Sequence, residues 1–151
     1  MAQVGRWLAR GRSEEGAQLV EFAFVLPVIL LITLGIADLG LMFQRYEVVT
    51  NAAREGARMA VLPGYTPDDV KARVTAYLSS GRGGPAPGTA VVLVEGTSIP
   101  VAGGRPPISA RRVTVTYTYT FQFLNALSAF FGTRAAVPLT AVAEMRTESG
   151  S

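Results

Sequence analysis

The chain has 151 residues, a formal net charge of +3 at pH 7 and a mean hydropathy of +0.31, which is high for a small soluble protein. It has no cysteine and no histidine, so disulfides, iron–sulfur clusters and thiolate zinc sites are excluded and the commonest general base is missing. Its basic residues are scattered arginines with a single lysine, without a stripe interleaved with aromatic residues, so nucleic-acid binding is not expected.

The first segment, residues 1–16, is a short polar leader that carries Arg6, Arg10 and Arg12. Arginines on this flank of an apolar segment favour keeping the N-terminal end in the cytoplasm. Three further arginines follow the apolar segment, so the difference in charge between its two flanks is small. We expect the C-terminal part of the chain to lie outside the cytoplasm.

Residues 17–43 form a nearly continuous apolar segment of membrane length. A helix from Phe22 to Phe43 would span about 33 Å, close to the roughly 30 Å hydrocarbon core of a bilayer. A removed secretory signal is the alternative, but its apolar region would be shorter and would end at a small-residue cleavage site. The segment is therefore predicted to be a transmembrane and assembly helix.

Pro27 lies inside this predicted helix, where it removes a backbone donor and crowds the carbonyl of Ala23. A kink or a local opening is expected there, and neighbouring helices can satisfy the freed carbonyl. The proline is either simply tolerated in the membrane or a weak point that bends during assembly, and the sequence leaves both interpretations open.

A lone carboxylate, Glu21, stands at the entrance of the apolar segment, five residues after Gly16. If the chain were cleaved after Gly16, Ala17 would carry a new terminal ammonium group one helical turn from Glu21. An ion pair between the two, within one chain or between neighbours, would relieve the cost of placing either charge in an apolar environment. The alternative is that Glu21 is solvated among the lipid headgroups.

The string GAQLVEF, from Gly16, resembles the class III leader-peptide junction of type IV pilins. The longer string through VEFAFVLPVILLITLGIADLG to NAAREGAR at 51–58 resembles the TadE-like family of minor pilins, which belong to the tight-adherence pilus machinery. The resemblance covers roughly residues 14–61. It implies cleavage after Gly16 by a prepilin peptidase and a role for Glu21 as the assembly carboxylate. Ala17 departs from the aromatic first mature residue of many type IV pilins.

A second acid, Asp38, lies near the outer end of the apolar segment, where solvation at the membrane interface is the expected account. The helical pattern continues through residues 44–62. Ala52, Gly56 and Ala60 form a stripe of small residues that permits close approach of another element. That element is either the chain's own sheet, which is favoured, or a neighbouring subunit.

Residues 63–151 are predicted to form an α+β head domain. Pro63-Gly64 ends the long helix, and a short helix is expected from Thr66 as N-cap to residues 79–81. The glycine-rich segment 81–88 is read as a loop, because the lysine and the preceding strand of a phosphate-binding motif are missing.

Three strands are predicted in the head, at Ala90–Glu95, Arg111–Phe123 and Val137–Arg146. In the second strand, valine and aromatic residues alternate with threonine, which indicates one core face and one threonine-rich outer face. A small apolar patch is noted on the connection that follows it, formed by Leu127, Phe130 and Phe131. The expected fold class is α+β: a long N-terminal helix packed at its outer half on a small antiparallel sheet.

The leading functional hypothesis is a structural subunit, a minor pilin or pseudopilin that enters or primes a pilus for adhesion or secretion. Its expected partners are the prepilin peptidase, other pilin subunits, the inner-membrane assembly platform and the lipid bilayer. Its expected location is the bacterial inner membrane, or an extracellular pilus. The alternative is an unprocessed single-pass protein whose head binds another envelope component. An enzyme is not expected, and no catalytic, cofactor or metal site is predicted.

Overall fold

The computed structural model describes residues 5–80, 89–103, 106–128, 132 and 134–147, with no account of the side chains of residues 5–15, 127 and 128. The long helix α1 spans Gly5–Ala60 and includes Pro27. It ends where the backbone N–H of Leu62 bonds to the carbonyl of Met59 at 3.1 Å. Gly64 then takes a positive φ of 89°, a conformation that glycine adopts without strain.

The second helix, α2, spans Pro67–Ser80 and begins with a reciprocal cap. The hydroxyl of Thr66 accepts the backbone N–H of Asp69 at 3.3 Å, and the Asp69 carboxylate accepts the Thr66 backbone N–H at 2.8 Å. These bonds satisfy donors that a helix start leaves open. The predicted start of α2 at Thr66 and Pro67 is therefore confirmed.

The sheet is a three-stranded antiparallel meander in the order β1-β2-β3. Its strands are β1 (Ala90–Ile99), β2 (Ile108–Thr120) and β3 (Ala136–Arg146). Three predicted strand boundaries are wrong by three residues or more. The first strand continues past Glu95, and the second begins at Ile108 rather than Arg111, because residues 97–99 pair with residues 108–110. The turn-rich composition of the segment between the two strands hid this pairing.

The predicted second strand also ends too late. Strand β2 stops at Thr120, and Phe123 begins the six-residue helix α3 (Phe123–Ser128). The inner face of β2 is otherwise as predicted, because Val113, Val115 and Tyr119 are buried. The predicted patch on the following connection includes Phe130 and Phe131, which lie outside the described residues.

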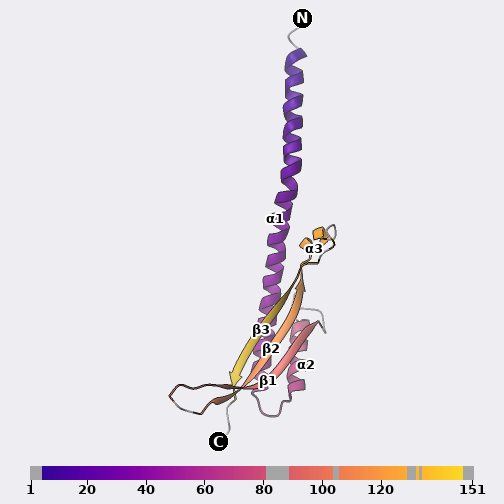
Figure 1. Ribbon diagram of the computed structural model, residues 1–151. Helices are drawn as coiled ribbons and strands as arrows, with labels where there is room; N and C mark the ends of the chain where they lie inside the picture. Colours follow the sequence, from indigo (N-terminus) through magenta and orange to yellow (C-terminus); the bar gives the residue numbers. More distant parts are fainter. Residues whose placement is uncertain (1–4, 81–88, 104–105, 129–131, 133, 148–151) are drawn as a thin grey trace.

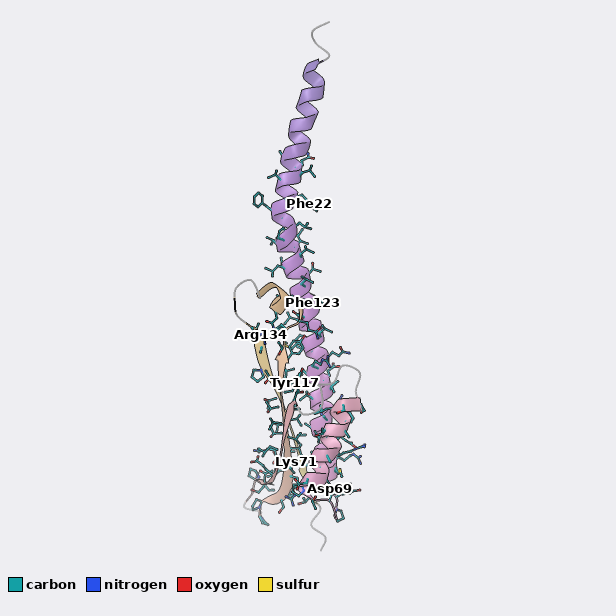
Figure 2. The ribbon with its side chains drawn as sticks, turned by 90° about the vertical axis from the view of Figure 1, so that its right-hand side faces the viewer. Phe22, Asp69, Lys71, Tyr117, Phe123 and Arg134 are labelled. Atoms are coloured by element: carbon teal, nitrogen blue, oxygen red, sulfur yellow. The ribbon has the colours of Figure 1, made fainter. Side chains whose placement is uncertain are left out.

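The head has two layers, with α1 and α2 on one face of the sheet (Figures 1 and 2). The core lies between these layers. It is made of small or β-branched residues from α1, valines and a leucine from α2, and the inward residues of β2 and β3: Val49, Ala52, Ala53, Ala57, Val70, Val74, Leu78, Val113, Val115 and Ala141. The predicted α+β architecture is confirmed, and the sheet packs on the C-terminal part of α1, which holds the core residues from Val49 to Ala57 (Figure 1).

Candidate functional site: the assembly helix and its junction with the head

The N-terminal part of α1 extends away from the head, and no other element lies beside it until α3 is reached (Figure 1). The large apolar side chains from Leu19, which is 69% exposed, to Ile36, which is 66% exposed, are all exposed except the half-buried Leu34. Among the described residues, this is the one helix long and apolar enough to cross a membrane. The arrangement is compatible with a single-pass membrane protein, because apolar surface of this extent is stable only against lipid or protein.

Gly16, Ala17 and Glu21 lie on this bare part of α1, and all three are exposed. An added Cβ at Gly16 would meet nothing within 4 Å, so the backbone there is open to approach by another protein. Because α1 is continuous from Ala17 to Glu21, the two residues are one turn apart on the same helix face. Within the described part of the chain, no hydrogen bond or ion pair holds the Glu21 carboxylate.

Pro27 also lies on the exposed part of α1, which remains helical on both sides of it. The adjacent apolar side chains Leu26 and Val28 are 38% and 55% exposed. Ala23, whose carbonyl the proline leaves without its usual donor, is exposed as well, so this part of the helix lies away from the core of the head.

The expectation that Asp38 is solvated by interfacial water is wrong. Its side chain is fully buried and accepts hydrogen bonds from three consecutive backbone N–H groups. Its Oδ1 lies 2.9 Å from the nitrogen of Gln122, and its Oδ2 lies 2.9 Å from Phe123 and 2.7 Å from Leu124. These are the groups that the start of α3 leaves without partners, so a residue of α1 caps a helix of the head.

Two further contacts tie the same end of the head together. The hydroxyl of Tyr119 donates to the backbone carbonyl of Asp38 at 3.3 Å. Burial raises the pKa of Tyr119, and the charge of Asp38 adds to that rise. The side chain of Asn125 bonds both the N–H and the carbonyl of Ala135, at 2.7 and 3.1 Å, and so closes the connection between β2 and β3.

The stripe of small residues on α1 faces the chain's own head. Ala52 and Gly56 are buried and Ala60 is half-buried. A Cβ added at Gly56 would stand 2.6 Å from Cγ2 of Val74 and 3.1 Å from Cγ1 of Val113. Glycine is therefore required here for the close approach of α1, α2 and the sheet.

One ion-pair cluster joins α1 to α2 near this contact. The Glu55 carboxylate lies 3.0 Å from the guanidinium of Arg58 and 3.1 Å from that of Arg73. Its hydrogen bonds to Arg58 and Arg73 lower the pKa of Glu55. Among residues with described positions, no three acids gather closely enough to hold a metal ion.

The fold and this junction define a class of protein: a small α+β head packed on one end of a single long helix, whose other end is exposed and apolar. The family model described as TadE-like protein matches residues 16–58, which include the apolar segment, Asp38 and Gly56. The resemblance to the TadE-like family is thereby confirmed. Searches of curated proteins and of solved structures gave no match.

Sequence reasoning identified the apolar helix and its carboxylates but missed the cap that Asp38 makes. One feature pointed to it: a carboxylate inside an otherwise apolar helix needs hydrogen-bond donors, and the head can supply them as well as interfacial water. Which donors those are depends on the path of β2, and on the backbone turning at Gln122 to begin α3.

Proposed function

We propose that this chain is a minor pilin or pseudopilin of a tight-adherence pilus, processed after Gly16 and incorporated into the filament or used to prime it. The observation that carries the proposal is the bare apolar half of α1 within the segment that matches the TadE-like family. A subunit of this shape is held by its apolar helix in the inner membrane. It can transfer the same helix into a bundle of other pilin helices.

The position of Glu21 supports this assignment. Its carboxylate is exposed on a bare helix, one turn from the residue that would carry the new terminal amine. In the unprocessed chain that amine does not exist, so removal of the leader creates the charge partner. Processing would thereby convert a membrane-held precursor into a subunit whose acid pairs with its own amine or with that of a neighbour.

The test is the intact mass of the full chain purified from membranes of cells that express an active prepilin peptidase. We expect loss of Met1–Gly16, and we expect Gly16→Leu to retain the leader. Gly11→Leu, a matched change inside the leader, should be processed normally. A full-length mass for the unaltered chain beside an active peptidase contradicts the proposal.

That contradictory result favours the alternative function, a single-pass protein whose head binds another envelope component. The structure offers one observation for it. The outer face of the sheet presents exposed Val91, Leu93 and Val142 at 69%, 50% and 58%. Such apolar positions on an open sheet face are suited to contact with another protein.

A further inference from the structure

Helix α3 lies beside α1 at the level of Asp38, at the end of the head that faces the bare half of α1 (Figures 1 and 2). The exposed apolar surface of α1 does not stop at Asp38. It continues toward the head through Leu39, 45% exposed, and Phe43, 62% exposed. Phe43 lies five residues further, about 7.5 Å along the helix. Helix α3 therefore overlaps the last part of the apolar band.

The polar groups at the start of α3 are satisfied without water. The first three N–H groups of this turn, from Gln122 to Leu124, bond to the buried carboxylate of Asp38. In water a side-chain cap also stabilises a helix start, as at Thr66 in α2, but water can replace it as the partner of the donors. In an apolar environment each open donor costs several kcal/mol, so internal pairing is required.

The surface of α3 continues the apolar surface of α1. Phe123, which Figure 2 places at the level of α3 beside α1, is 39% exposed. Ala126, three residues further along the same helix, is also exposed. Beyond Phe43, the exposed side chain of Tyr46 marks the change to polar surface. Tyrosine is enriched at the level of lipid headgroups, which places the boundary of the bilayer near this residue.

We propose that α3 seats the head on the bilayer, with Phe123 inserted at the boundary between headgroups and acyl chains on the side where the head lies. At the level of Asp38, α3 lies about 7.5 Å deeper than Phe43, the residue at which the apolar band ends. This distance is within the depth of roughly 5–10 Å at which interfacial helices lie. The Asp38 cap fixes the depth at which α1 crosses. The occupant of this surface is lipid, because the surface is continuous with the lipid-spanning band of α1. This inference rests on the proposed membrane anchoring.

The experiment uses the full chain reconstituted in phosphatidylcholine vesicles, with the single native tryptophan replaced by Trp7→Phe. Separate variants carry one probe each: Phe123→Trp or Ala126→Trp on α3, Phe24→Trp on the bare helix, and Tyr65→Trp at the far end of the head. Quenching is measured with lipids brominated on their acyl chains and with acrylamide in the water. Two probes are placed on α3 so that the test still works if one of these two variants does not fold.

We expect the α3 probes to be quenched by brominated lipid within about a factor of two of Phe24→Trp, and Tyr65→Trp to be quenched only by acrylamide. If Phe24→Trp is quenched by lipid and the α3 probes behave like Tyr65→Trp, the seating is overturned while the anchoring stands. If the α3 probes resist both quenchers, another protein surface covers α3 and the inference fails. If Phe24→Trp is not quenched by lipid, the anchoring and the seating fail together.

Discussion

The Oδ2 atom of Asp38 lies 2.7 Å from the backbone nitrogen of Leu124, and the two residues are 86 positions apart in the chain. This bond and its two companions fasten the start of α3 to the middle of α1. Because the carboxylate is fully buried and α3 has only six residues, the cap and the short helix depend on one another. The head is therefore held at one fixed position along α1.

Replacing Asp38 should loosen α3 more than it loosens the rest of the head. Asp38→Asn keeps one acceptor oxygen, whereas Asp38→Ala leaves three backbone donors without a partner. We expect losses of about 1–3 kcal/mol in the free energy of unfolding, larger for alanine. We also expect faster hydrogen exchange at residues 122–124, measured by mass spectrometry on the full chain in detergent micelles.

Asp68→Asn is the matched control for this change. The Asp68 side chain is 89% exposed and pairs with Lys71 at 3.0 Å, so its loss should alter stability by no more than about 0.5 kcal/mol. Equal exchange at residues 122–124 in Asp38→Ala and in the unaltered chain would show that the cap does not hold α3.

A second prediction concerns the contact of α1 with α2. Gly56→Ala places a methyl group 2.6 Å from the side chain of Val74, which must shift within a packed core. Overpacking of this kind costs about 1–3 kcal/mol and outweighs the roughly 1 kcal/mol that alanine gains over glycine in a helix. Thermal unfolding of the full chain in micelles should report the loss.

Two variants make this second prediction specific. Gly40→Ala adds the same methyl group where nothing lies within 4 Å, and it should not destabilise the head. Val74→Ala makes room beside Gly56, so the double variant should lose less than the two single losses added together. Strict additivity would show that the two side chains do not meet.

A third prediction concerns pH. Arg58 and Arg73 lower the pKa of Glu55 from its ordinary value of 4.5, and hydrogen bonds from Thr66 lower the pKa of Asp69 from 3.8. A carboxyl group whose pKa is lower in the folded state stabilises that state above its unfolded pKa. This contribution to stability disappears as the pH falls through the pKa of the group in the folded state. The head should therefore lose stability when the pH is lowered from about 5 toward 3.

Glu55→Gln should reduce this acid-induced loss, with a change near neutral pH of no more than about 1 kcal/mol because both arginines are largely exposed. Glu47→Gln, an exposed change on the same helix, is the control. Unfolding midpoints are measured across the pH range. If the cluster contributes nothing, the midpoint of Glu55→Gln will fall with decreasing pH as steeply as that of the unaltered chain.

Much of this fold follows from local patterns in the sequence. The cap at Thr66, the alternation around Val113 and Val115, and the helix end before Gly64 are each set by neighbouring residues. These features were predictable because local geometry and burial point to the same structure. The limits of β1 were harder to predict, because residues 97–99 join the strand only through pairing with β2.

The cap that Asp38 forms on α3 could not be predicted either, because it also depends on contacts between residues that are distant in the chain. The sequence FLNALS has too few residues to be stable as a helix alone, and its start is capped by Asp38 from 85 positions away. From sequence, solvation by interfacial water is the favoured account of Asp38, because it lies near the end of the apolar segment. Only the folded chain brings the carboxylate and the three amides together.

The last prediction tests Glu21 as the assembly carboxylate. Glu21→Gln keeps the size of the side chain and removes the charge that would pair with the new terminal amine of Ala17. We expect the variant to insert in the membrane and lose its leader as usual, while its amount in sheared filaments falls at least about tenfold, equivalent to a pairing energy of about 1.4 kcal/mol. Immunoblots of the membrane and filament fractions measure both quantities.

Glu47→Gln is again the suitable control, because Glu47 is exposed on the same helix but lies beyond the apolar band. It should enter filaments at the normal level. Normal incorporation of Glu21→Gln, with the leader removed, would show that the Glu21 charge has no part in assembly. Loss of the protein from the membrane fraction would instead assign Glu21 to insertion, which an acid at the membrane entrance is not expected to support.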